Sequence, residues 1–452
     1  MLQRTWGIAF AAMAMIASVM FVSARDMDVM EKIVVDSIWP GTRVGYALLT
    51  HGDRQYVAYY DSDRNMAVAQ RKRGETEFSK TVLPSRQTWD SHNYITMALD
   101  KRGYLHLSGN MHVDNLVYFR STQPGDASTL QQIPAMVGKQ ENRVTYPKFM
   151  QDPDGNLIFH YRHGGSGNGL EVYNVYDPDT QTWRRLLDQP LISGNGKSNA
   201  YMRGPMRGPQ GWYHLLWMWR DTPDVATNHD LSYARSRDLL HWQTAAGVPL
   251  TLPITPADTS TVVDPVPVKG GLHNSNHHLG FDSKGNVVVT YFKHDESGDT
   301  QAYAARPTDG QWVIKQISDW KGRHIFRGGG SGPSTFGTAL GLKAPRQHGE
   351  GKLALPVHHW LAGQGLLVFD EQTLAPLGTA PERKPYPAAL STVISTFPGM
   401  QVNWQSDSGS TPDENSRYVL RWETLGTNRD RPREGPLPES QALVLYKISR
   451  QE

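Results

Sequence analysis

Two histidines, a tyrosine and an arginine stand near two consecutive strand–turn–strand patterns within residues 89–169. His92 and His112 lie on either side of a turn at residues 100–103, and Tyr146 and Arg162 lie on either side of a turn at residues 152–155. Imidazole and phenol groups can take up and return protons, and a guanidinium group can bind a carboxylate through two parallel hydrogen bonds. These residue types predict proton transfer on a substrate that carries an acidic group.

Each of these residues also has a purely structural interpretation. Tyr146 lies in Thr145-Tyr146-Pro147, and a proline there excludes a regular central strand, which favours a strand start or a loop. A packed tyrosine with a hydrogen-bonded hydroxyl fits the same pattern. His92 and His112 read equally well as strand-end histidines bonded to the backbone. The residues alone leave both interpretations open.

The elements that must position these side chains are strands. A turn containing glycine followed by an alternating apolar strand recurs seven times, the seventh copy being the less regular residues 417–422. Strand-only repeats of this length predict an all-β fold, a seven-bladed β-propeller in which each repeat forms one blade. Residues 442–448 are expected to pair with residues 33–38 and close the ring, since an open ring would expose strand edges. Two packed β domains are the alternative.

A turn signature supports the same architecture. Ser236, Asp238 and Trp242 match the pattern Ser-x-Asp-x-x-x-Trp, in which the aspartate bonds backbone amides of a turn and the tryptophan packs between strands. The motif predicts structure and says little about chemistry.

The N-terminus and the composition bear on location. Residues 1–24 read as a secretory signal peptide, with Arg4, an uncharged apolar run and a small-residue cleavage pattern at residues 22–24. We therefore expect a secreted or periplasmic protein whose residues 25–452 form one catalytic domain, without a membrane span after cleavage. The chain has no cysteine, which excludes disulfides and thiolate metal sites. Its formal net charge is +2, so attraction for an acidic polymer must come from local clusters of basic residues.

Four motifs carry a resemblance to a known family: SHNY (91–94), SGNMH (108–112), VTYP (144–147) and YRHGGSGNG (161–169). Further support lies in residues 227–242, 271–294 and 417–425. In these stretches the chain resembles the β-propeller polysaccharide lyases that cleave ulvan, and the wider BNR-repeat family around them. The resemblance implies a lyase that cleaves an anionic, uronate-containing polysaccharide by β-elimination and leaves a 4,5-unsaturated uronate end.

The resemblance also implies roles for the four residues. Tyr146 would serve as base and acid, with Tyr161 as the fallback. Arg162 would neutralise the uronate carboxylate. His92 and His112 would contact the carboxylate and orient the tyrosine, although either could be the base instead.

Other polar residues in the matching motifs are expected to bind substrate; they are Asn93, Asn110, Tyr161, His163, Tyr201, Arg203, His273, Asn274 and Asn276. The chemistry requires no cofactor. A structural metal ion near His214 and His229 is suggested by some relatives. The expected partner is the anionic polysaccharide, with no nucleic acid.

Two other functions fit parts of the pattern. A sialidase-like glycoside hydrolase would use arginines on a sugar acid and a carboxylate as acid or base, but no motif places that carboxylate. A carbohydrate-binding propeller without activity would use only the aromatic residues to hold sugar.

Overall fold

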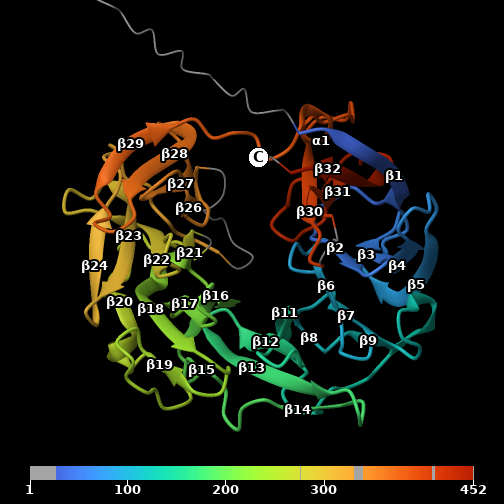
Figure 1. Ribbon diagram of the computed structural model, residues 1–452, viewed down its shortest axis with the longest axis horizontal. Coiled ribbons are helices and arrows are strands. Elements are labelled where there is room, and N and C mark those ends of the chain that lie inside the picture. The colour runs from blue at the N-terminus through green and yellow to red at the C-terminus, as the bar shows by residue number, and fades with distance from the viewer. Residues whose placement is uncertain (1–26, 275, 330–338, 410–412, 451–452) are drawn as a thin grey trace, which may run out of the picture.

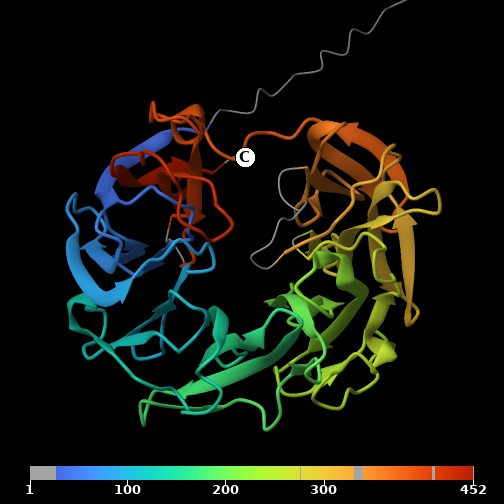
Figure 2. The same ribbon diagram turned by 180° about the vertical axis from the view of Figure 1, so that it is seen from behind.

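The strands of the described residues form seven antiparallel sheets that follow one another around a ring (Figure 1). The structure is a computed structural model, and it describes residues 27–274, 276–329, 339–409 and 413–450. Seen from behind, the same sheets surround a central region (Figure 2). The ring therefore brings together side chains from sheets that are far apart in the sequence.

Strands are given in their order across each sheet. The first sheet contains β1 (Val29–Ile38), β32 (Gln441–Ser449), β31 (Ser416–Leu425) and β30 (Met400–Ser406), and the second contains β2 (Ala47–His51), β3 (Arg54–Tyr60), β4 (Asn65–Lys72) and β5 (Ser79–Arg86). The third contains β6 (Ile95–Leu99), β7 (Leu105–Gly109), β9 (Tyr118–Ser121) and β10 (Leu130–Gln132). The fourth sheet contains β8 (His112–Asp114), β11 (Val144–Gln151), β12 (Leu157–Gly165), β13 (Asn168–Asp177) and β14 (Thr182–Arg185), with β15 (Ile192–Ser193) beside β13.

The fifth sheet contains β16 (Asn199–Arg207), β17 (Tyr213–Arg220), β18 (Asn228–Ser236) and β19 (Trp242–Gln243), with β20 (Val262–Asp264) beside β18. The sixth contains β21 (His277–Phe281), β22 (Val287–His294), β23 (Thr300–Thr308) and β24 (Gln311–Gln316). The seventh contains β25 (Leu340–Leu342), β27 (Lys352–His359), β28 (Gly363–Asp370) and β29 (Pro376–Ala380), with β26 (Arg346–Gln347) beside β27. The helices of the described residues are short: α1 (Ala388–Ser391) and the 3-10 turns η1 (Ala127–Thr129), η2 (Val225–Thr227) and η3 (Thr259–Thr261).

The all-β prediction is confirmed, and the repeated pattern has a consistent place in the fold. Each of the seven turn–strand copies falls in a different sheet and forms an interior strand of it; these strands are β3, β7, β12, β17, β22, β27 and β31. Such strands are buried on both faces, since β17 is buried throughout. This burial explains their nearly continuous apolar sequence.

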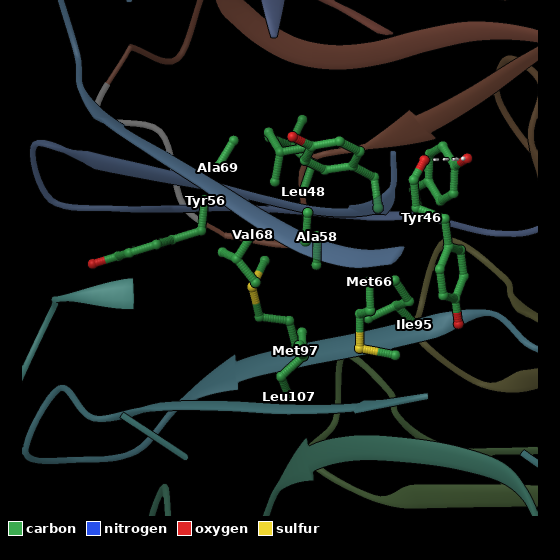
Figure 3. Packing of buried hydrophobic residues seen from close by; sticks show 14 of the residues in the cluster. Tyr46, Leu48, Tyr56, Ala58, Met66, Val68, Ala69, Ile95, Met97 and Leu107 are labelled. Atoms are coloured by element: carbon green, nitrogen blue, oxygen red, sulfur yellow. Dashed lines mark hydrogen bonds between the residues drawn. The ribbon is translucent and has the colours of Figure 1, made fainter. Parts of the chain in front are cut away.

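The core lies between neighbouring sheets. One cluster joins β2, β3 and β4 to β6 and β7, with Leu48, Val68 and Met97 among its members (Figure 3). The same cluster continues to Tyr418 and Leu445 in the sheet that contains β31 and β32. Each sheet alone would leave one face apolar and exposed, so packing against its neighbours is what stabilises it.

The two ends of the described chain share one sheet, as predicted. Strand β1 pairs with β32 in an antiparallel register that sets Ile33 opposite Leu445 and Val34 opposite Val444. The C-terminal strands therefore depend on an N-terminal strand to complete their sheet.

The turn signature has the structural role expected for it. The Asp238 carboxylate accepts hydrogen bonds from the backbone N–H groups of Leu240 and His241, both at 2.8 Å, and Trp242 is buried. The predicted signal peptide, residues 1–24, lies outside the described residues. Within the described part of the chain, the structure contains no helix that is long and apolar enough to cross a membrane.

Candidate active site

Tyr146 is displaced from its strand by a bulge. The register between β11 and β12 shifts between Thr145 and Lys148, and Tyr146 has a φ of 58°, in the left-handed region that a bulky residue rarely occupies. Pro147 has no N–H group to continue the ladder, and its carbonyl oxygen accepts a hydrogen bond from the Tyr94 hydroxyl at 3.1 Å. The local strain thus turns the Tyr146 side chain out of the regular strand pattern, as is common at functional sites.

The bulge sets Tyr146 between two other predicted site residues. Thr145 pairs with His112 of β8 on one side and with Arg162 of β12 on the other. The guanidinium carbon of Arg162 lies 4.8 Å from the centroid of the Tyr146 ring. The sheet register therefore brings these three side chains together.

The two histidines form a stacked pair. The His92 and His112 rings have centroids 3.9 Å apart and planes inclined by 24°, and the His92 ring lies 5.8 Å from the Tyr146 ring. Asp90, in the loop between β5 and β6, contacts both: its carboxylate oxygens lie 2.7 Å from Nδ1 of His92 and 2.6 Å from Nδ1 of His112. About 30% of each imidazole is exposed, so a ligand can reach them.

Arg162 is a buried charge with donors to spare. It is 1% exposed, and within the described residues its Nε and Nη1 atoms have no hydrogen-bond acceptor. Gly169 on β13 permits this position, because a Cβ atom there would lie 2.9 Å from Cδ of Arg162. Gly169 in the glycine-rich segment thus allows close packing inside the protein. Buried donors without acceptors are rare and indicate a ligand or water oxygen.

The pKa of Tyr146 is set by burial and by two nearby cations, which act in opposite directions. Burial of the hydroxyl is the largest influence and raises the pKa to about 12, while Arg162 and Arg220 act in the opposite direction with smaller effect. Desolvation disfavours the phenolate more than the two cations favour it. The resting side chain is a neutral phenol.

Further predicted residues extend the site along the neighbouring sheets. Tyr201 on β16 interacts electrostatically with Tyr146, and its hydroxyl lies 2.7 Å from Oγ of Ser166. Arg220 on β17 lies over the Tyr201 ring at 4.9 Å. The pKa of His273 is lowered to about 3, chiefly by burial and also by His324 and Arg220. Basic and aromatic groups thus continue from Tyr146 toward the sheet that contains β21.

Arg203 belongs to the same region. Burial lowers its pKa, and its charge also lowers the pKa of buried His277 on β21. Arg203 therefore belongs to the basic and aromatic groups that extend from Tyr146 toward the sheet that contains β21.

The asparagines are used in several ways. Asn93 donates to the side-chain oxygen of Asn110, and Asn110 donates to the carbonyl oxygen of Arg86 at 3.0 Å, so these two residues frame the histidine loop. Asn276 contacts Nδ1 of His273 at 2.7 Å and accepts from the Leu342 amide. Asn274 has a buried side-chain oxygen with no partner among the described residues.

Tyr161 and His163 point away from the Tyr146 cluster. Adjacent strand residues face opposite sides of a sheet, so Tyr161 and Arg162 cannot both face Tyr146. Tyr161 is fully buried in an apolar cluster, and its hydroxyl accepts a hydrogen bond from Arg185 at 3.0 Å. His163 contacts the side chain of Asn142 at 3.2 Å. The fallback role of Tyr161 and the substrate-binding role of both residues are not supported by this placement.

The candidate metal residues are not brought together. His214 is the second residue of β17 and lies opposite Arg235, whereas His229 lies opposite Trp219 near the other end of that strand. Five residues of extended strand separate the two positions, about 16 Å. Nδ1 of His214 contacts the Tyr233 hydroxyl, and both ring nitrogens of His229 contact aspartates. The two histidines do not fit one shared metal site.

Three residues of the site escaped the sequence reasoning. Asp90 immediately precedes the SHNY motif that contains His92, and a carboxylate two residues from a histidine is a signal that could have identified it. Arg220 follows a run of apolar residues and resembles the end of a core strand. Asp430 lies in the loop between β31 and β32, with Oδ2 3.6 Å from Nδ1 of His92, and no local pattern marks it.

A ring of antiparallel sheets with polar residues gathered between neighbouring sheets is typical of repeat-built all-β proteins. The model of the BNR repeat-containing family matches residues 54–320, more than half of the 452-residue chain, so the chain belongs to that family.

The curated relatives are ulvan lyases. The chain is 30% identical over 132 residues to the long isoform from Pseudoalteromonas sp. (strain PLSV), which is 27% of this chain and 13% of the relative. It is 24% identical over 280 residues to a long isoform from Alteromonas sp., a match that covers 49% of this chain and 28% of the relative. It is 29% identical over 175 residues to the short isoform from Alteromonas sp. (strain LOR), a match that covers 35% of this chain and 32% of the relative. The match thus spans about a third or less of each relative.

Two solved structures share the fold. The polysaccharide lyase Uly1 is 14% identical with a TM-score of 0.61, over 93% of this chain and 99% of that one. A family PL25 ulvan lyase bound to -[GlcA(1-4)Rha3S]- is 12% identical with a TM-score of 0.54, over 88% and 94%.

Proposed function

We propose that this protein is an exported polysaccharide lyase that cleaves ulvan by β-elimination. In this proposal residues 25–452 form one catalytic domain and the seven sheets are the blades of a seven-bladed β-propeller. The protein would be secreted or periplasmic after residues 1–24 are removed. The reaction would require no cofactor. The observation that carries the proposal is the convergence of His92, His112 and Arg162 on Tyr146, in a chain whose curated relatives are ulvan lyases.

The reaction would begin with the uronate carboxylate. A positive charge beside this group makes the C5 proton more acidic by stabilising the carbanion-like transition state. Arg162 supplies that charge, because its Nε and Nη1 donors have no acceptor in the described part of the chain. A guanidinium group whose donors lack acceptors suits a carboxylate.

The proton transfers would then be divided between the imidazoles and the phenol. His92, with its ring 5.8 Å from that of Tyr146, takes the C5 proton. The electron pair of the C5–H bond forms the C4=C5 double bond, and the C4–O4 bond breaks. Tyr146 donates its proton to O4, a role suited to a phenol whose pKa is raised to about 12 and which is therefore protonated at neutral pH. This assignment makes a histidine the base, whereas the sequence reasoning favoured Tyr146 for both steps.

The test is an assay of the purified protein on a panel of acidic polysaccharides that includes ulvan. Ultraviolet absorbance of the unsaturated uronate reports elimination, and a reducing-end assay reports cleavage by any route. The proposal expects both signals from ulvan. Reducing ends without absorbance would instead indicate a hydrolase, and binding without either product would indicate a carbohydrate-binding protein.

A further inference from the structure

One carboxylate holds both histidines of the candidate site. Oδ1 of Asp90 lies 2.7 Å from Nδ1 of His92 and 2.8 Å from its backbone nitrogen, and Oδ2 lies 2.6 Å from Nδ1 of His112. The two rings are stacked at 3.9 Å. A single side chain therefore fixes the separation and the orientation of both imidazoles.

This arrangement dictates which ring nitrogens carry protons. An ionised carboxylate can only accept hydrogen bonds, so the Nδ1 atoms that face it must both be protonated. Burial acts to raise the pKa of Asp90, but the hydrogen bonds from His112 and His92 outweigh it and hold the pKa well below its usual range. In the neutral state of each ring, Nε2 is then the nitrogen with a free lone pair.

A second carboxylate secures the same loop from a distant part of the chain. Asp430, between β31 and β32, accepts hydrogen bonds from the backbone nitrogen and the hydroxyl of Ser91, both at 2.8 Å. Its other oxygen lies 3.6 Å from Nδ1 of His92. Because Ser91 lies between Asp90 and His92, the sheet of β31 and β32 braces the loop that carries both residues.

Metal binding is an alternative use for Asp90, His92, His112 and Asp430, since one potential ligand atom from each lies within 4.8 Å of the others. The contacts of Asp90 argue against this use. Ligands of a tetrahedral zinc ion, each about 2.0–2.2 Å from the metal, are more than about 3 Å apart. The separations of 2.6 and 2.7 Å between Asp90 and the imidazoles are hydrogen-bond lengths.

We propose that Asp90 is a positioning residue that holds His92 and His112 in the tautomer with Nε2 unprotonated, and that Asp430 braces the loop that carries Asp90. The inference rests on the proposed function insofar as it concerns the rate of β-elimination. Its structural part, the tautomer of the two rings, does not depend on any activity.

The variant that tests this is Asp90→Asn. An amide of the same size can accept at one histidine but must offer an N–H group to the other, so one ring has to place its proton on Nε2 instead. We expect kcat to fall by ~10²–10⁴, the range found when general acid–base catalysis is lost, while KM changes less. Asp238→Asn is the matched control, since Asp238 makes a similar 2.7 Å contact with Nδ1 of exposed His241 in the turn between β18 and β19. The control should keep the parental rate.

Nitrogen-15 spectra of histidine-labelled protein supply the second measurement. Signals are assigned with His92→Gln and His112→Gln, and thermal unfolding verifies that each variant is folded. The parent should show unprotonated Nε2 for both rings in the neutral state, and Asp90→Asn should move the proton of one ring. If Asp90→Asn does not fold, Asp430→Ala, which removes the Ser91 brace, should shift the His92 signals and lower kcat.

The outcomes separate the two proposals. Parental tautomers in folded Asp90→Asn, or an unchanged kcat, would overturn the positioning role. Loss of activity on chelation with recovery on adding Zn²⁺ would also overturn it, because the cluster would then be a metal site. Correct tautomers in a protein that eliminates no uronate polymer would leave the positioning role standing and refute the lyase.

Discussion

The guanidinium group of Arg162 lies against the face of the Tyr146 ring, with its carbon 4.8 Å from the ring centroid. Arg162 is a buried cation on β12, and the bulge in β11 displaces Tyr146 toward it. It stabilises negative charge near the hydroxyl, yet the burial of the hydroxyl keeps the phenol neutral. The pair thus combines a proton donor with an adjacent positive charge.

Tyr146→Phe should fold normally and lose most of the activity. The change keeps the ring on which Arg162 packs and removes only the hydroxyl, so we expect kcat to fall by ~10²–10⁴. Release of unsaturated product from ulvan is the measurement. Tyr161→Phe is the control, because it removes a buried hydroxyl bonded to Arg185 on the other face of the sheet. Equal losses in the two variants would show that the hydroxyl of Tyr146 has no special role.

Arg162→Lys should lower kcat/KM by about 10- to 100-fold. Lysine keeps the charge but lacks the planar pair of donors that fits a carboxylate, which is worth roughly 1–3 kcal/mol. Arg120→Lys is a matched control, since Arg120 lies over the Tyr176 ring at 5.9 Å without contacting the site. A kcat/KM that stays at the parental value in Arg162→Lys would rule out a bidentate contact with substrate.

The raised pKa of Tyr146 predicts a loss of stability at alkaline pH. The folded protein keeps this proton up to about pH 12, whereas the unfolded chain loses it near pH 10, so unfolding becomes easier as pH rises through that interval. One group contributes a slope of up to about 1.4 kcal/mol per pH unit. Urea unfolding of the parent and of Tyr146→Phe between pH 9 and 11.5 measures the difference. Parallel curves would place the pKa of Tyr146 near its ordinary value.

The lowered pKa of His359 predicts that the free energy of unfolding falls in acid. Its Nδ1 atom accepts hydrogen bonds from the backbone nitrogens of Leu361 and Ala362, and its pKa is lowered to about 4 by burial and by His358 and His324. The unfolded chain takes up a proton near pH 6.5 and the folded ring does not, so stability falls from that pH toward 4.

His359→Phe keeps the stacking on Trp320 and removes the titrating group. The variant should be less stable at pH 7, because two backbone donors lose their acceptor, but less sensitive to acid. Unfolding free energies at pH 7, 6, 5 and 4.5 provide the measurement. His241→Phe, at a side chain that is 88% exposed, should keep the parental pH slope.

Removal of β1 should destabilise the ring. A chain that begins at residue 39 loses the partner of β32, the buried Ile33 and Ile38, and the hydrogen bond from Tyr59 to Asp36. Burial of each isoleucine is worth about 1.5–3 kcal/mol, so Tm should fall by about 5 °C or more relative to a chain that begins at residue 27. Identical melting of the two chains would show that closure by β1 contributes nothing to stability.

The sequence by itself determined the strand content and the residue types of the site. Turns with glycine and alternating apolar residues are local signals, and each of the seven copies became a strand in its own sheet. The pairing of the chain ends could also be predicted, because two unpaired strand patterns remained at opposite termini. The motifs likewise selected His92, His112, Tyr146 and Arg162, which the fold brings together.

Only the tertiary structure decided how these groups are held and charged. The β11 bulge separated Tyr146 from Tyr161, although both tyrosines lie near a turn in the sequence. Asp430 reaches Ser91 across 339 positions, a contact that no local pattern encodes. The protonation of Tyr146 depends on burial by several sheets balanced against two arginines. Register, burial and summed charge are properties of the packed ring, because residues remote in the sequence create them together.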